Sequence, residues 1–197
     1  MFVIIICVGD HALGCTPVRP LDIVFAVDSA AIGGINAQHV LEFVANVSEA
    51  VMGAQLVSMA TVTSGCAGGV LDDRQFIDPE SVKIAAAEYS IPSLDSLLRN
   101  MRLKAADGRS NAGHIGIVFV NKKLSPAEKS QSVREVMRAR YQKTVVNIIA
   151  VGPDVNMVDI ERLVVNGGQL WRVPSFQELP SLGRNVLFTL CTFGLLE

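Results

Sequence analysis

Charged and aromatic residues are scarce in this chain of 197 residues. Charged residues make up 18% of it, aromatic residues 6%, and the formal net charge is −2. This balance gives no electrostatic basis for binding nucleic acid or an anionic membrane surface. Hydrophobic residues make up 50% of the chain, which excludes a disordered protein and is enough for one domain with a full core.

The motifs of nucleotide binding and of common catalytic sites are also missing. Neither G-x-G-x-x-G nor G-x-x-x-x-G-K-[ST] follows the first apolar run. The only histidines are His11, His39 and His114, and no Cys or His pair has the spacing of zinc ligands. Ser29 lacks the G-x-S-x-G context of a nucleophile. We therefore expect no enzyme; the enzyme alternative would rest on Asp28 alone.

What the sequence does have is a regular alternation of apolar runs and amphipathic stretches. The expected parallel strands are 21–27, 55–63, 114–120, 144–151 and 169–173, and Val70-Leu71 starts a short antiparallel edge strand. The expected helices begin near residues 36, 78, 93, 125, 156 and 175. The alternation predicts an α/β fold: a doubly wound, mostly parallel six-stranded sheet (Rossmann-like) with one antiparallel edge strand and helices on both faces.

The first 14 residues differ from the rest. Phe2 to Val8 is an apolar run too short to span a bilayer, and Ala12 and Gly14 precede Cys15 as small residues do at a signal-peptidase site. We expect residues 1–14 to be a signal peptide or its remnant and residues 15–197 to be a single secreted domain. The alternative is an apolar arm or an extra edge strand.

The positions of the cysteines and of one sequon bear on whether the domain is secreted. Cys15 and Cys191 bracket the alternating pattern, and chain termini can lie close together in such folds, so we expect a disulfide between them. Cys66 would then be available for an intermolecular bridge. The alternative is three buried free thiols in a cytosolic protein. Asn46-Val47-Ser48 is an N-glycosylation sequon, and Asn46 lies off the apolar stripe of its helix.

Three stretches resemble a known family. They are PLDIVFAVDSAAIGG from Pro20, HIGIVFVNKKLS from His114, and residues 144–191. They resemble von Willebrand factor type A domains, most nearly those of the matrilin, cochlin and collagen VI group. The resemblance covers about residues 15–191 and is loose between 65 and 113. Many extracellular members of the family have a terminal disulfide at the positions of the first and last cysteines of this range.

The resemblance also implies a metal-ion-dependent adhesion site. In the family this site is built from Asp-x-Ser-x-Ser, a threonine on a second loop and an aspartate after the fourth strand. Here Asp28 matches, but Ala30 and Ile32 take the serine positions and Asn121 replaces the aspartate. The second loop, shortened to residues 90–93, has no threonine. Mg²⁺ prefers six oxygen ligands, so we expect the Mg²⁺ site to be lost and no cofactor to bind.

The function that the resemblance implies is a non-enzymatic extracellular module for protein–protein interaction or matrix assembly, independent of metal. Its partners would be extracellular-matrix or cell-surface proteins, collagen-like ones included. Asp28, Ser29, Ser90 and Asn121 are the candidate ligand-binding residues, although Asp28 could instead accept hydrogen bonds from loop amides. A second possibility is a disulfide-linked structural oligomer of an extracellular material, bridged through Cys66.

Overall fold

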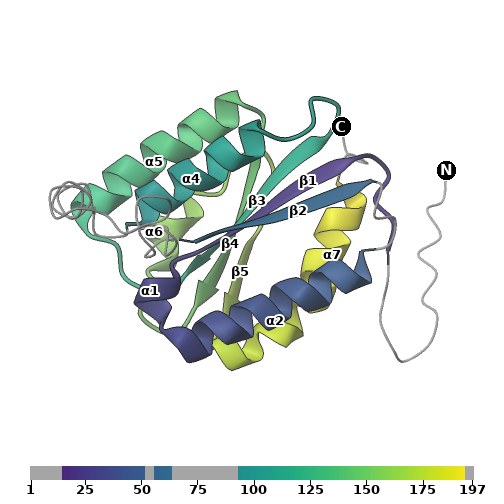
Figure 1. Cartoon of the computed structure of the whole chain (residues 1–197). Helices are drawn as coiled ribbons and strands as arrows, with labels where there is room; N and C mark the ends of the chain where they lie inside the picture. Colours follow the sequence, from purple (N-terminus) through teal and green to yellow (C-terminus); the bar gives the residue numbers. More distant parts are fainter. Residues whose placement is uncertain (1–14, 52–55, 64–92, 194–197) are drawn as a thin grey trace, which may run out of the picture.

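A five-stranded sheet lies at the centre of the structure, a computed structural model that describes residues 15–51, 56–63 and 93–193 (Figure 1). All strand pairs are parallel, in the order β2-β1-β3-β4-β5. The strands are β1 (Leu21–Val27), β2 (Val57–Thr63), β3 (Gly113–Val120), β4 (Val145–Val151) and β5 (Leu170–Val173). The five parallel strands that the sequence predicted are therefore present. The sixth, antiparallel strand was expected at Val70-Leu71, which lies outside the described residues.

The inner strands are apolar because helices cover both of their faces. Every residue of β1 and of β4 is buried, whereas β2 at the sheet edge alternates between half-buried and exposed residues. Continuous apolar runs are typical of parallel strands that are buried on both sides. Asp22 is the one charged residue in these two strands and therefore needs a partner.

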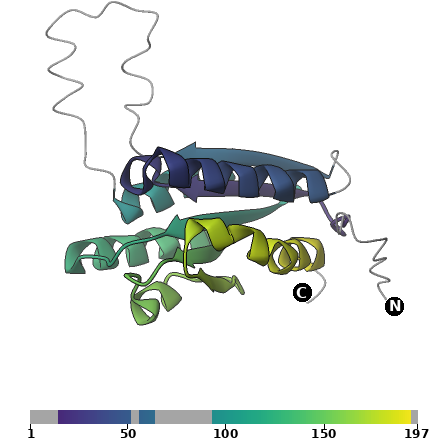
Figure 2. The same cartoon turned by 90° about the horizontal axis from the view of Figure 1, so that it is seen from below.

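One face of the sheet is covered by α1 (Ser29–Ile32), α2 (Gly34–Ala50), the 3₁₀ helix η1 (Phe176–Leu182) and α7 (Gly183–Thr192). Figure 2 views the molecule from below, with α2 and α7 running across the near side. Phe25 of β1 and Val47 of α2 belong to the core on this face, where the rings of Phe43 and Phe119 meet edge to face at 6.2 Å. Pro180 accompanies the 3₁₀ geometry of η1, where the sequence predicted one continuous closing helix.

The other face is covered by α4 (Leu94–Ala106), α5 (Pro126–Tyr141) and α6 (Met157–Glu161). Val24 and Ile148 of the sheet belong to one core on this face, together with Leu98 and Met101 of α4. A Cβ atom at Gly116 of β3 would overlap the Met101 side chain, so glycine allows α4 to approach the sheet closely. The two helical layers thus enclose separate apolar cores, one on each side of the sheet.

The two ends of the described chain are joined covalently. A disulfide links Cys15 to Cys191 in α7, with a Cα–Cα distance of 6.1 Å. The Cys15 backbone N–H also donates to the Ala50 carbonyl at the end of α2, at 2.9 Å. The predicted bridge is thus present in the structure. Within the described ranges, no helix is long and apolar enough to cross a bilayer.

Candidate functional site

The carboxyl ends of β1 and β3 bring Asp28 and Asn121 to one edge of the sheet. The two strands are neighbours, with Ala26 paired to Val118, and each is followed directly by its polar residue. A recess at this edge has room for about one water molecule, about 10 Å³. Its lining residues are Asp28, Leu94, Leu97, Phe119, Val120, Asn121, Lys122 and Leu124. The lining of the recess is therefore mostly apolar, and its polar members are Asp28, Asn121 and Lys122.

Asp28 already has a local structural role. It is the N-cap of α1, and its Oδ1 accepts a hydrogen bond from the Ala31 backbone N–H at 3.2 Å. Its backbone carbonyl accepts from the Ile32 N–H, also at 3.2 Å. A capping carboxylate satisfies one of the unpaired N–H groups at a helix start. Asp28 therefore accepts a hydrogen bond from a nearby backbone amide, as its structural alternative predicts.

The two positions that would hold serines in an adhesion site point to different environments. Ala30 is exposed and offers no side-chain oxygen. Ile32 is 8% exposed and belongs to the core beneath α2. A serine at Ile32 would exchange buried apolar surface for a hydroxyl that needs a partner. The chain thus uses this position for packing.

Lys122 lines the recess, and its ammonium pairs with Glu128 at the start of α5. Lys122 Nζ lies 3.0 Å from Glu128 Oε1, and Glu128 Oε2 accepts from the Ser125 backbone N–H at 3.1 Å. In return, the Ser125 hydroxyl accepts from the Glu128 N–H at 3.2 Å, which completes the predicted capping box. Partial burial raises the pKa of Glu128, but the hydrogen bonds from Ser125 and Lys122 outweigh burial and leave that pKa below its ordinary value.

Ser29, the first residue of α1, does not line this recess. Ser90 lies outside the described residues, whereas Ser93 caps α4 in a box with Ser96, whose hydroxyl accepts from the Ser93 N–H at 3.1 Å. Asp154, in the loop after β4, is exposed and does not line the recess. Across residues 15–51, 56–63 and 93–193, no group of three or more His, Cys, Asp or Glu side chains could hold a metal ion.

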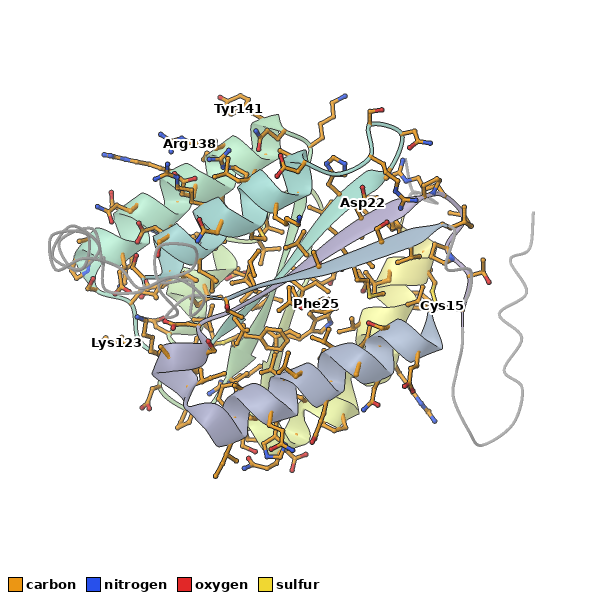
Figure 3. All side chains as sticks on the ribbon, viewed as in Figure 1. Cys15, Asp22, Phe25, Lys123, Arg138 and Tyr141 are labelled. Carbon is orange, nitrogen blue, oxygen red and sulfur yellow. A yellow bond between two sulfur atoms is a disulfide. The ribbon has the colours of Figure 1, made fainter. Side chains whose placement is uncertain are left out.

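A second polar cluster, which the sequence did not predict, lies at the opposite end of the sheet (Figure 3). Asp22 of β1 accepts from Arg109 Nε at 2.9 Å and from the Arg109 backbone N–H at 2.5 Å. A terminal nitrogen of Arg109 donates to the carbonyls of Leu21 (2.8 Å) and Leu56 (3.1 Å). His114 Nε2 lies 4.0 Å from Asp22 Oδ2. This cluster fastens the loop after α4 to β1. A single acidic residue in an otherwise apolar strand was the only sequence signal for it.

Comparisons with known proteins find similarity of fold alone. No model of a known family and no curated protein matches the chain. Among solved structures, proximal thread matrix protein 1 from the mussel byssus matches with a TM-score of 0.64 and 17% identity, over 88% of this chain and 46% of that one. The pilus adhesin SpaC from Lactobacillus rhamnosus GG, in an open conformation, matches with a TM-score of 0.59 and 11% identity, over 91% and 31%.

A third matched structure is described as a von Willebrand factor type A domain. A von Willebrand factor type A structure from Catenulispora acidiphila matches with a TM-score of 0.54 and 13% identity, over 86% of this chain and 42% of that chain. The chain thus spans less than half the length of each of these three structures. The mussel protein has also been solved with zinc in its MIDAS motif, the metal-ion-dependent adhesion site. That structure matches with a TM-score of 0.63.

Proposed function

Because the chain has the fold of a von Willebrand factor type A domain, we propose that it is a non-enzymatic module for protein–protein interaction or matrix assembly that works without a bound metal ion. The fold is one that commonly mediates contacts between proteins. The observation that carries the metal-independent part is the composition of the recess at the carboxyl ends of β1 and β3. One carboxylate, one amide and one ammonium group are its polar side chains.

This composition disfavours a hard cation for three reasons. Mg²⁺ needs near-octahedral oxygen coordination and gives up its waters reluctantly. Asp28 is the one carboxylate there and already accepts the Ala31 N–H, while Ile32 is packed in the core. Lys122 also lines the recess but supplies no oxygen ligand, and its ammonium is paired with Glu128. A cation would therefore meet few ligands.

Several features support an extracellular partner for this module. The Cys15–Cys191 disulfide is of a kind that persists in oxidising compartments. One matched protein is a byssal thread matrix protein and another is a pilus adhesin. Matrix or cell-surface proteins, collagen-like ones included, are the partners we propose. Asp28, Ser29 and Asn121 form the candidate contact face.

Titration calorimetry of the purified chain with MgCl₂, MnCl₂ and ZnCl₂ tests metal independence. We expect no saturable binding at micromolar concentrations. The matched control is the double variant Ala30→Ser/Asn121→Asp, which adds two oxygen ligands beside Asp28 and should bind Mn²⁺ more tightly than the parent chain. Micromolar, saturable Mg²⁺ or Mn²⁺ binding by the parent chain would contradict the proposal.

A pull-down tests the interaction function. The chain is immobilised and exposed to secreted extract with and without EDTA. We expect the same proteins to be captured in both conditions, and Asn121→Lys to reduce their capture because it adds a bulky charge at the recess. Capture that EDTA abolishes would contradict metal independence. The alternative of a disulfide-linked oligomer depends on Cys66, outside the described residues; non-reducing and reducing gels test that prediction.

A further inference from the structure

Positive charge is concentrated in one part of the chain. Residues 93–144, which span α4, β3, α5 and their connections, hold 11 of the 17 Lys and Arg residues but 4 of the 19 Asp and Glu residues, a formal net charge of +7. The remaining residues hold 6 basic and 15 acidic residues, a formal net charge of −9. An overall charge of −2 therefore conceals a strongly polarised molecule, and such polarity favours an oppositely charged partner.

The outer face of α5 combines this charge with exposed apolar side chains. Val133, Met137 and Tyr141 repeat every four residues, so they form one stripe along the helix. All three are exposed, and Tyr141 is 83% exposed. Arg134 and Arg140, both exposed, flank the stripe. Tyrosine, methionine and arginine are residue types enriched in protein interfaces.

The helix pair beneath this face is arranged so that positive charge remains at the surface. The buried carboxylate of Glu135 accepts from Arg102 of α4 at 3.2 Å and is also paired with Arg138 of α5. Two guanidinium groups thus share one carboxylate. Figure 3 shows Arg138 and Tyr141 projecting outward from α5. This face is not neutralised by its own helices, so an acidic, partly apolar surface would complement it.

The outer face of α2 is such a surface, on the opposite side of the sheet (Figure 1). Helix α2 has no Lys or Arg and carries Glu42 and Glu49, both exposed. Ile35 is 75% exposed and Leu41 is 53% exposed. The two helices also match in length, with 17 residues in α2 and 16 in α5. Each therefore presents a similar length of mixed apolar and charged surface, of opposite sign.

We propose that the outer face of α5 in one copy of the chain packs against the outer face of α2 in a second copy. The apolar stripe would meet Ile35 and Leu41, and the arginines would meet Glu42 and Glu49. Because the two faces differ and lie on opposite sides of the sheet, the contact is heterologous and repeats into an open chain or a closed ring of more than two domains. One helix pair buries less than a standard interface of about 1,200–2,000 Å², so the association is weak. It uses a surface distinct from the recess and goes beyond the proposed function.

Sedimentation velocity of unglycosylated protein from a bacterial host is the test. At about 50 mM NaCl we expect the weight-average mass to rise with protein concentration up to about 500 µM, beyond the mass of a dimer. At about 500 mM NaCl the rise should be largely lost, because the charges are screened. A chain that stays monomeric, or stops at a closed dimer, at the lower salt would overturn the proposal.

Charge-swapped variants identify the two faces. Arg134→Glu/Arg140→Glu reverses the α5 face, and Glu42→Arg/Glu49→Arg reverses the α2 face. Each is expected to weaken self-association by about tenfold or more, since like charges then face each other. An equimolar mixture of the two should recover heteroassociation, because the reversed faces complement one another. Failure of the mixture to recover it would overturn the pairing of these two helices.

Two controls keep this result separate from the proposed function. Arg172→Glu reverses an exposed charge on β5, outside both faces, and should leave the association unchanged. Asn121→Lys alters the recess and should also leave it unchanged, although it reduces capture of extract proteins. A glycan at Asn46, which is exposed on α2, should block the contact sterically. Association that either control abolishes would count against the α5–α2 contact.

Discussion

Asp22→Asn is expected to destabilise the protein by about 2–3 kcal/mol, because Asp22 anchors the loop after α4. Asp22 lies within β1 and is 6% exposed. Its carboxylate accepts from the Arg109 backbone N–H at 2.5 Å and from Nε at 2.9 Å, and a terminal nitrogen of Arg109 lies 2.7 Å from Oδ1. An asparagine keeps one acceptor oxygen but removes the charge and places an NH₂ group where Oδ2 now accepts.

The size of this effect follows from how exposed each partner is. Removing one partner of a buried ion pair costs about 3–5 kcal/mol, because the other charge is left uncompensated. The Arg109 side chain is 36% exposed, so water recovers part of its solvation. Arg109 also keeps its hydrogen bonds to the carbonyls of Leu21 and Leu56. Both features lower the expected loss of unfolding free energy below the range of about 3–5 kcal/mol for a fully buried ion pair.

Urea unfolding, followed by the fluorescence of the single tryptophan, Trp171 in β5, measures the cost. Thermal unfolding should shift down by about 4–12 °C, at about 2–4 °C per kcal/mol for a domain of this size. Asp107→Asn is the matched control, since it makes the same chemical change at an exposed position in the same loop, and should stay within about 0.5 kcal/mol of the parent. If Asp22→Asn also stays within that range, the anchoring role is refuted.

Two further predictions concern the bridge and the α5 cap. Reducing the Cys15–Cys191 disulfide, or replacing both cysteines with serine, should lower the free energy of unfolding by up to about 5 kcal/mol. The reason is that a bridge with a sequence separation of 176 restricts the unfolded chain. Equal urea midpoints with and without reductant would contradict this prediction. Glu128→Gln should cost about 0.3–1 kcal/mol at neutral pH, because glutamine can keep the capping-box hydrogen bond but loses the charge that pairs with Lys122 and favours the helix N-terminus. Since the folded pKa of Glu128 lies below its ordinary value of 4.5, this contribution is present above that value and is lost as the pH falls through the folded pKa. Urea titrations of the parent and the Glu128→Gln variant at several pH values measure this contribution. A difference in stability that does not change with pH would count against the prediction.

Local patterns predicted most of the elements of this fold. The apolar runs that became β1, β3 and β4 and the capping box that opens α5 are legible in the sequence, because burial on both faces and helix capping leave short-range signatures. The sequence also placed Asp28 and Asn121 at the ends of their strands. The sequence did not predict the change from one closing helix to η1 followed by α7, although Pro180, which has no backbone N–H to donate, lies within η1.

The candidate site was only partly predictable, because side-chain direction depends on packing. The sequence indicated that Ile32 replaces a metal-ligating serine, but only the folded structure places Ile32 in the core. Likewise, only the structure brings Lys122 to the recess beside Asp28 and gives that aspartate a capping partner. The residue types alone suggest a poor metal site, and metal independence stays a prediction for calorimetry to test.

The sequence by itself determined the order of strands and helices, the positions of Asp28 and Asn121 at the ends of their strands and the uneven distribution of charge along the chain. The tertiary structure decided which of these features meet. Asp22 and Arg109 are 87 residues apart, and nothing in either local pattern specifies their contact. The opposite placement of α2 and α5 also follows only from the winding of the chain about the sheet. Periodicity records whether a residue is buried, whereas contacts over long separations depend on how whole elements pack.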